Sequence, residues 1–245
     1  MELARQFHWA RQGRCGGLAT VWFRSVHLLT IPPFRALKRE FGDRPFNLLD
    51  VGCGNHQPTK TKRYFPNCAY HGVDITPDYN NDQADMLAMK RFWQVDLTTL
   101  DFDEIPNGYF DAIVMNHVIE HLYNGDEVLA GLARKLKPGG IVYVEFPGPR
   151  SLNLPSMPGT LNFSDDQTHV RLFTASEVAR VLEESGCRVL EAGTRRVWLR
   201  VFATPVVMAY HRVRRGTFLG GALWDLTGFA EFVKARRTDQ PAPTA

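Results

Sequence analysis

Cysteine is scarce in this sequence, and its spacing excludes two kinds of protein. The four cysteines among 245 residues, Cys15, Cys53, Cys68 and Cys187, form no CxxC pair and no metal-ligand spacing with histidine. A disulfide scaffold or a cysteine-based metal site would need such spacing. We therefore expect reduced thiols and a cytoplasmic protein.

Long apolar runs are also missing. No stretch reaches the roughly 18 apolar residues that a membrane-spanning helix requires. The N-terminal region has early arginines, but Arg24 and His27 interrupt its apolar part and no small-residue cleavage site follows, so no secretory signal is expected. The 44% hydrophobic content is instead enough to close a sizeable core.

A strong charge of one sign is absent as well. The formal net charge is only +3, so the total does not demand nucleic acid as a partner. The charge is unevenly distributed: residues 1–45 carry +5, residues 46–194 carry −8 and residues 195–245 carry +6. An acidic central body is therefore flanked by two basic ends, and neither end follows a known nucleic-acid-binding module.

Strand-like and helix-like patterns alternate from residue 46 onward. Short, mostly apolar runs predict strands over residues 46–52, 69–75, 91–97, 110–116, 140–147, 187–193 and 197–203. Near-continuous apolar strands indicate a sheet that is covered on both faces. The alternation predicts an α/β fold: a Rossmann-like, doubly wound, mostly parallel sheet with an antiparallel C-terminal strand, flanked by N- and C-terminal cap elements.

Two helices have clear limits in the sequence. Apolar spacing predicts a helix over residues 120–136, followed by Pro138-Gly139-Gly140. A second helix begins after Thr174, with Glu177 at the capping-box position, and runs to residue 184.

The rest of the chain divides around these elements. We expect an N-terminal helical cap over 1–45, a central domain over 46–205 and a basic extension over 206–245. The irregular segment 147–167 resembles a functional loop, because loops of this length inside compact domains are often lids.

Candidate binding residues follow the first three predicted strands. Asp50-Val-Gly52-Cys-Gly54 ends the first, Asp74 ends the second and Asp96 ends the third. In a doubly wound sheet, ligands bind beyond the carboxyl ends of the strands, and an acid after the second strand can accept both hydroxyls of a ribose. A nicotinamide-dependent oxidoreductase would need a third glycine where this chain has Gln57, so we disfavour that alternative.

Five motifs in order carry a resemblance to a known family: LLDVGCGN, HGVDI, QVDL, FDAIVMNHVIEHL and LKPGGIVYVEFP. Over residues 46–190 the chain resembles the class I S-adenosylmethionine-dependent methyltransferases, in their small-molecule branch. The resemblance implies S-adenosyl-L-methionine as cofactor. It also implies a set of cofactor-binding residues: Asp50, Gly52, Gly54, Asp74, Ile75, Asp96, Leu97 and Asn116.

The resemblance also implies what these positions do. Asp50 and the glycines would face the amino acid portion of the cofactor, and Asp74 would bind the ribose hydroxyls. Ile75 would pack on the adenine, whose amino group Asp96 would accept near the Leu97 backbone. Further along, Asn116 and His117 would line the methyl-donor side, and the pair Glu120 and His121 also matches the family.

A hydroxyl acceptor must lose its proton, and histidine is the usual base near neutral pH. The stretch DDQTHVRLF resembles the H-x-R-x-F segment of many small-molecule methyltransferases, which makes His169 the leading candidate base and Asp166 its orienting partner. His117 is the reserve candidate. A purely structural histidine is the alternative reading of His169. Asp166 and His169 could ligate a metal, but the sequence offers no clear third ligand, so no metal site is predicted.

Both flanks mix aromatic or aliphatic residues with arginines. The simpler interpretation is a cap that covers the pocket and completes the core. The other is a surface for a membrane or for an anionic, lipid-linked substrate, which Arg212, Arg214 and Arg215 beside VVMAY suggest. We thus predict transfer of a methyl group to a small molecule, with oxygen as the expected acceptor atom. A non-catalytic nucleoside-binding protein of the same fold remains the alternative.

Overall fold

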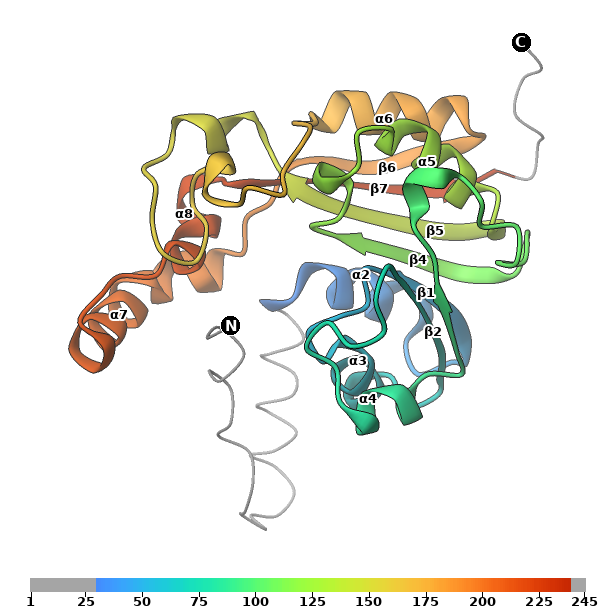
Figure 1. The fold of residues 1–245 in the computed structure, drawn as a ribbon, viewed down its shortest axis with the longest axis horizontal. Helices are drawn as coiled ribbons and strands as arrows, with labels where there is room; N and C mark the ends of the chain where they lie inside the picture. The colour runs from blue at the N-terminus through green and yellow to red at the C-terminus, as the bar shows by residue number, and fades with distance from the viewer. Residues whose placement is uncertain (1–29, 239–245) are drawn as a thin grey trace.

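Seven strands form one sheet in the order β3-β2-β1-β4-β5-β7-β6 (Figure 1). The structure, a computed structural model, describes residues 30–238, so most of the predicted N-terminal cap and the terminal QPAPTA lie outside the described residues. The first five strands pair in parallel, whereas β7 runs antiparallel to both β5 and β6. This confirms the predicted fold class. The strands are β1 (Phe46–Val51), β2 (Cys68–Asp74), β3 (Arg91–Gln94), β4 (Phe110–Asn116), β5 (Leu136–Pro147), β6 (Cys187–Thr194) and β7 (Ala230–Arg237).

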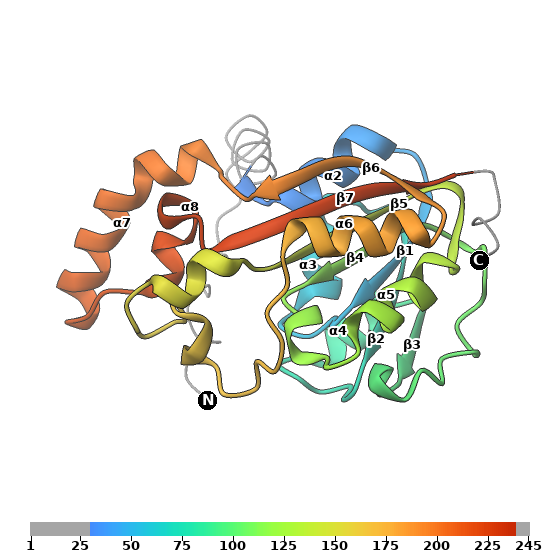
Figure 2. The same cartoon turned by 90° about the horizontal axis from the view of Figure 1, so that it is seen from above.

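Helices cover both faces of the sheet, α2 and α3 on one side and α5 and α6 on the other (Figure 2). Because side chains alternate along a strand, each central strand serves two apolar cores. In β4, Ala112 and Val114 belong to the core beneath α2, and Ile113 and Met115 belong to the core beneath α5 and α6. The α-helices are α2 (Pro32–Phe41), α3 (Gln57–Tyr64), α4 (Gln83–Ala88), α5 (Gly125–Ala133), α6 (Ala175–Glu184), α7 (Trp198–Arg215) and α8 (Trp224–Thr227).

Helix α6 begins as the sequence predicts. The Thr174 side chain accepts a hydrogen bond from the Glu177 amide, and the Glu177 carboxylate accepts one from the Thr174 amide at 2.8 Å. This reciprocal capping satisfies two amides that the helix itself cannot bond. The helix then buries Val178 and Leu182 against the sheet.

The predicted helix over residues 120–136 is wrong at both ends. Residues Ile119–His121 form a 3₁₀ turn, η3, and α5 occupies only Gly125–Ala133. Strand β5 already starts at Leu136, which pairs with Phe110 of β4. The apolar residues near each end therefore fill the core from a turn and a strand, which helical spacing alone does not distinguish.

The predicted strand over residues 197–203 is also wrong, because this segment opens the 18-residue helix α7. Its aromatic and β-branched residues favour a strand locally, but no sheet edge receives them. Strand β7 takes the place beside β5 instead, and it comes from the segment predicted as a C-terminal extension. The segment predicted as an extension thus contributes an internal strand to the sheet. Within residues 30–238, none of the helices combines the length and the apolar character that crossing a bilayer requires.

Two ion pairs of Arg195 join the C-terminal part of the chain to the central sheet. Arg195, just after β6, is buried and donates to Glu145 of β5 at 2.9 Å and to Asp225 of α8 at 3.0 Å. Glu145 also accepts a hydrogen bond from Tyr143 at 2.8 Å. Although burial opposes its charge, Arg195 and His117 lower the pKa of Glu145 to about 2. Glu145 is therefore ionised at neutral pH inside the fold.

We expect Arg195→Leu to lower the free energy of unfolding by about 3–5 kcal/mol, because it leaves buried carboxylates without their partner. Urea unfolding followed by circular dichroism measures the change. The control is Arg180→Ala, which removes an exposed pair with Glu184 on α6 and should cost roughly 0.5 kcal/mol or less. Equal costs for the two variants would contradict the structural role of Arg195.

Candidate functional site

A cavity of about 810 Å³ opens beyond the carboxyl ends of the parallel strands. Its wall includes every residue that the sequence singled out for binding or catalysis. These are Asp50, Gly52, Gly54, Asp74, Ile75, Asp96, Leu97, Asn116, His117, Asp166 and His169. Parallel strands end at one edge of the sheet, so residues far apart in sequence meet there. Their individual roles remain predictions.

The loop after β1 explains the missing third glycine. Gly52 has φ +75°, and a Cβ there would collide with the side chain of Val118. Asn55 and His56 also adopt left-handed conformations, at φ 59° and 56°, which these two residue types tolerate better than most. Helix α3 then starts at Gln57, so the position of the third glycine is already helical.

His56 is the N-cap residue of α3. Its Nδ1 lies 2.5 Å from the buried carboxylate of Asp85, and its side chain is not part of the cavity wall. His56 therefore belongs to the start of α3 and not to the cavity.

Asp50 is buried at the end of β1, where its carboxylate accepts a hydrogen bond from Tyr70 at 2.6 Å. Burial raises the pKa of Asp50 to about 7, despite that hydrogen bond. A cationic group in the cavity would favour the ionised carboxylate.

Two further carboxylates and one amide line the same side of the cavity. Burial also raises the pKa of Asp74, which ends β2. The exposed Asp96 accepts hydrogen bonds from the amide and hydroxyl of Thr98, at 2.9 and 2.7 Å, and caps a short 3₁₀ turn. Within residues 30–238, the buried Oδ1 of Asn116 has no hydrogen-bond donor. These acceptors fit a ligand rich in hydroxyl and amino groups, such as a nucleoside.

His117 lies between two buried carboxylates. Its Nδ1 is 3.2 Å from Glu120 and its Nε2 is 3.4 Å from Glu145. Burial opposes its charge, but these two carboxylates raise the pKa of His117 to about 9. An imidazole that is protonated at neutral pH does not accept a proton, so the geometry disfavours the reserve role predicted for His117. Its backbone is left-handed, at φ +53°.

His169 is held against Glu120 by the backbone. The amide of the next residue, Val170, donates to the Glu120 carbonyl at 2.9 Å. The His169 Nδ1 lies 2.7 Å from the Phe163 carbonyl, and because a carbonyl only accepts, Nδ1 must carry the proton. In the neutral ring, Nε2 therefore keeps the lone pair that a general base needs.

The predicted orienting role of Asp166 is not what the structure shows, because Nδ1 bonds Phe163 instead. Asp166 Oδ2 lies 4.0 Å from Nε2 of His169. Its Oδ1 accepts hydrogen bonds from the amide and hydroxyl of Thr168, at 2.9 and 2.6 Å. Asp166 therefore lies near Nε2, and the Phe163 carbonyl orients the His169 ring.

Sequence reasoning missed the residues that close the cavity from the C-terminal side. Trp224 and Phe229 line it, with ring centroids 4.7 Å apart, and the Trp224 indole donates to the Thr160 carbonyl at 2.5 Å. The segment 147–167 and the C-terminal region therefore meet over the pocket. The only sequence signal was the aromatic content of the flank.

A methyltransferase domain family matches residues 26–192, more than half of the chain. The chain belongs to this methyltransferase family. The match confirms the family that the sequence motifs indicated. It also favours methyl transfer over the nicotinamide-dependent alternative.

Several known proteins are similar to this methyltransferase. Trans-aconitate 2-methyltransferase of Methylobacterium nodulans is 31% identical over 105 residues, which cover 42% of the chain and 39% of that protein. Demethylmenaquinone methyltransferase of Tropheryma whipplei is 35% identical over 113 residues, covering 44% and 45%. The matched residues thus span less than half the length of each of these two relatives. A solved S-adenosylmethionine-dependent methyltransferase from Archaeoglobus fulgidus shares the fold, with a TM-score of 0.53, 17% identity and coverage of 87% and 94%.

The raised pKa of Asp50 makes the stability of the methyltransferase depend on pH. An ordinary aspartate ionises near 3.8 and the folded one near 7, so between these values the folded chain holds a proton that the unfolded chain has released. The free energy of unfolding therefore falls as pH rises through this window. Relative to the wild type, Asp50→Asn should gain up to about 4 kcal/mol above pH 7 and little near pH 4. Urea unfolding at both pH values measures this, and a gain that is independent of pH would contradict it.

Proposed function

We propose that this methyltransferase transfers the methyl group of S-adenosyl-L-methionine to an oxygen of a small-molecule acceptor. The observation that carries the proposal is the Nε2 lone pair of His169 in the wall of a cavity whose other end offers nucleoside-binding acceptors. The cofactor supplies, when bound, a methyl group that its sulfonium already activates, so the protein mainly aligns the reactants and excludes water.

We assign the cofactor to the side of the cavity nearest β1, β2 and β3. Asp74 would accept the ribose hydroxyls, and Asp96 would accept the adenine amino group beside Leu97. Ile75, which is 59% exposed, would pack on the adenine and lose that exposure. The unpartnered Oδ1 of Asn116 supports a donor group of the ligand nearby.

The amino acid portion of the cofactor would lie over the loop after β1. Gly52 and Gly54 contribute no side chains to the cavity wall, which Asp50 also lines. The ammonium group of the cofactor would then favour the ionised form of Asp50.

The acceptor would lie between the cofactor and His169. As the methyl group moves to the acceptor oxygen, Nε2 of His169 would take the hydroxyl proton. The protonated ring stays oriented by its Nδ1 hydrogen bond to Phe163 and would be stabilised by Glu120, whose Oε1 is 3.9 Å from Nε2. Trp224 and Phe229 would cover the reacting groups and keep bulk water away.

We expect His169→Ala to lower kcat for a hydroxyl acceptor by about 10²- to 10⁴-fold, the usual contribution of a general base. Binding of S-adenosylmethionine, followed by calorimetry, should stay close to that of the wild type. His211→Ala on α7 is the matched control, since that histidine is not in the cavity wall. Unchanged turnover in His169→Ala would refute the base. Cofactor binding without turnover on any acceptor by the wild type would instead favour a non-catalytic binding protein.

We also propose that α7 brings the methyltransferase to an anionic membrane surface, where a lipid-linked or membrane-dissolved acceptor would be available. Helix α7 projects with α8 from the sheet (Figure 1). Apart from Val207, its large exposed apolar side chains share one side: Trp198, Leu199, Phe202, Val206, Tyr210 and Val213. At 100° per residue they fall within an arc of about 120°. Phe202 is 76% exposed and Val213 is 84% exposed, which is unusual for side chains that gain from leaving water.

The charges of α7 favour an anionic partner. The helix has no acidic residue, and Arg212 and Arg214 flank the apolar side at its two borders. An amphipathic helix with basic borders is typical of segments that lie in a bilayer interface. Each arginine near an anionic surface contributes about 1 kcal/mol.

Vesicles that contain anionic lipid should bind the methyltransferase at low salt, and binding should weaken as salt rises. We expect the double variant Leu199→Asp/Phe202→Asp to lose at least about tenfold in affinity, because it loses apolar contact and adds negative charge. Leu87→Asp is the control, since Leu87 is 80% exposed on α4, away from this surface. Co-sedimentation measures binding. Equal loss in both variants, or no binding by the wild type, would refute the proposal.

A further inference from the structure

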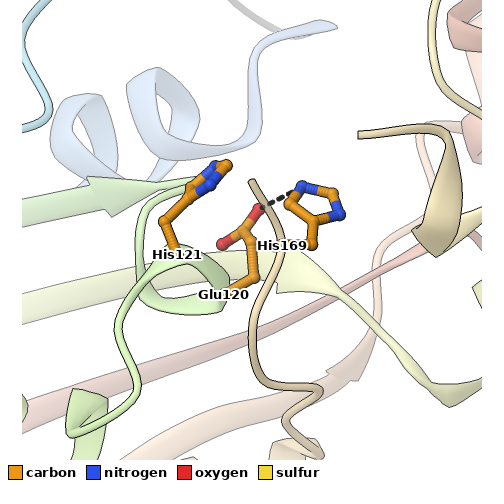
Figure 3. Close-up of side chains that lie close together, drawn as sticks. All are labelled: Glu120, His121 and His169. Atoms are coloured by element: carbon orange, nitrogen blue, oxygen red, sulfur yellow. Dashed lines mark ion pairs between the residues drawn. The ribbon is translucent and has the colours of Figure 1, made fainter. Parts of the chain in front are cut away.

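Glu120, His121 and His169 form a cluster in the cavity wall that the proposed methyl transfer uses only in part. One possible ligand atom from each of the three residues lies within 4.8 Å of the others. Figure 3 shows the Glu120 carboxylate beside the two imidazole rings, whose centroids are 4.9 Å apart. Two of these residues come from η3 and the third from the segment before α6, so the tertiary fold brings them together.

Both histidines have the same hydrogen-bonding arrangement. Nδ1 of His169 donates to the Phe163 carbonyl. Nδ1 of His121 lies 3.1 Å from the Thr168 carbonyl and 2.9 Å from its hydroxyl. Since the Thr168 hydroxyl gives its own proton to Asp166, Nδ1 of His121 must also be a donor. Metal-bound histidines characteristically donate their second ring nitrogen to a backbone carbonyl, which fixes the ring and raises its basicity.

The Glu120 carboxylate has one oxygen without a hydrogen-bond partner among the described residues. Glu120 is 1% exposed, and this oxygen is its Oε2. A buried carboxylate oxygen without a donor is costly. The other histidine–carboxylate cluster, His56 with Asp82 and Asp85, differs here because its buried carboxylate is fully used by His56, Thr59 and the helix cap.

We propose that Glu120, His121 and His169 bind a divalent transition-metal ion such as Zn²⁺, with Asp166 as a fourth ligand. Two imidazoles and a carboxylate are the ligand set of catalytic zinc sites, in which metal–ligand distances near 2.0–2.2 Å leave the ligand atoms about 3–4 Å apart. Nε2 of His169 is 3.9 Å from Glu120 and 4.0 Å from Asp166. Small side-chain adjustments close the site. Mg²⁺ prefers oxygen ligands alone and fits it less well.

A bound ion would change how the acceptor loses its proton, and this consequence rests on the proposed function. When bound, the ion would hold Nε2 of His169 as a ligand and would supply Lewis-acid activation of the acceptor hydroxyl, lowering the pKa of that hydroxyl so that its proton could leave to water. The acceptor oxygen would form its bond to the methyl carbon as the carbon–sulfur bond of the cofactor breaks. Without the ion, His169 would take the proton itself.

The test is calorimetric titration of the chelator-treated full chain with Zn²⁺, and with Mg²⁺ for comparison. We expect one Zn²⁺ per chain, bound at least about 100-fold more tightly than by His121→Ala or Glu120→Gln. His211→Ala should bind as the wild type does. Thermal unfolding should show a stabilisation by Zn²⁺ that the two site variants lose, and circular dichroism confirms that they fold. In addition, NMR of the imidazole nitrogens should show that Co²⁺ broadens the signals of His121 and His169 and spares His56.

The outcomes separate this proposal from the proposed function. Equal Zn²⁺ affinity in wild type and His121→Ala, tighter binding of Mg²⁺ than Zn²⁺, or broadening centred on His56 would each refute the metal site. If the metal site fails while S-adenosylmethionine still binds and turnover still depends on His169, the proposed function stands. If Zn²⁺ binds at the site but S-adenosylmethionine does not bind, the proposed function fails and the metal site stands.

Discussion

The site depends on a buried row of alternating charges. Glu120, His117, Glu145, Arg195 and Asp225 follow one another through ion pairs at 3.2, 3.4, 2.9 and 3.0 Å. Each buried charge is tolerated only because the next one compensates it. Since the row joins η3, β5, the end of β6 and α8, it fixes the C-terminal segment against the sheet.

This constraint accounts for the unusual features of the site. The His117 ring lies between two carboxylates, and its left-handed backbone donates its amide to the Glu145 carbonyl at 2.8 Å. Trp224 covers the cavity because α8 is tied to Arg195 through Asp225, and the Arg195 guanidinium lies 5.5 Å from the Trp224 ring. The row ends at Glu120, whose Oε1 lies 3.9 Å from Nε2 of His169 and whose Oε2 has no hydrogen-bond donor among the described residues. Chemistry in the cavity thus takes place next to a carboxylate that the fold has already positioned.

Predictions from local pattern succeeded at some positions and failed at others. Asp50, Asp74 and Asp96 were placed at one cavity because each ends a strand, and parallel strands expose their carboxyl ends together. The Thr174 cap was placed by its own side-chain chemistry. In contrast, residues 197–203 look like a strand but form a helix, and residues 120–136 look like one helix but divide into a turn, a shorter helix and the start of a strand. For residues 197–203, β7 occupies the place in the sheet beside β5. For residues 120–136, the pairing of β5 with β4 outweighs the helical propensity of the last residues.

The sequence by itself determined the fold class, the order of the first five strands and the family, because these depend on short-range patterns. Only the tertiary structure decided the tautomer of His169, the charge of His117, the insertion of β7 and the grouping of Glu120 with two histidines. The physical reason is distance along the chain. Arg195 meets Glu145 across 50 residues and Asp225 across 30, and His169 meets Glu120 through a backbone bond from the next residue. Such contacts form only when separate elements pack together, so the residue pattern within one element does not predict them.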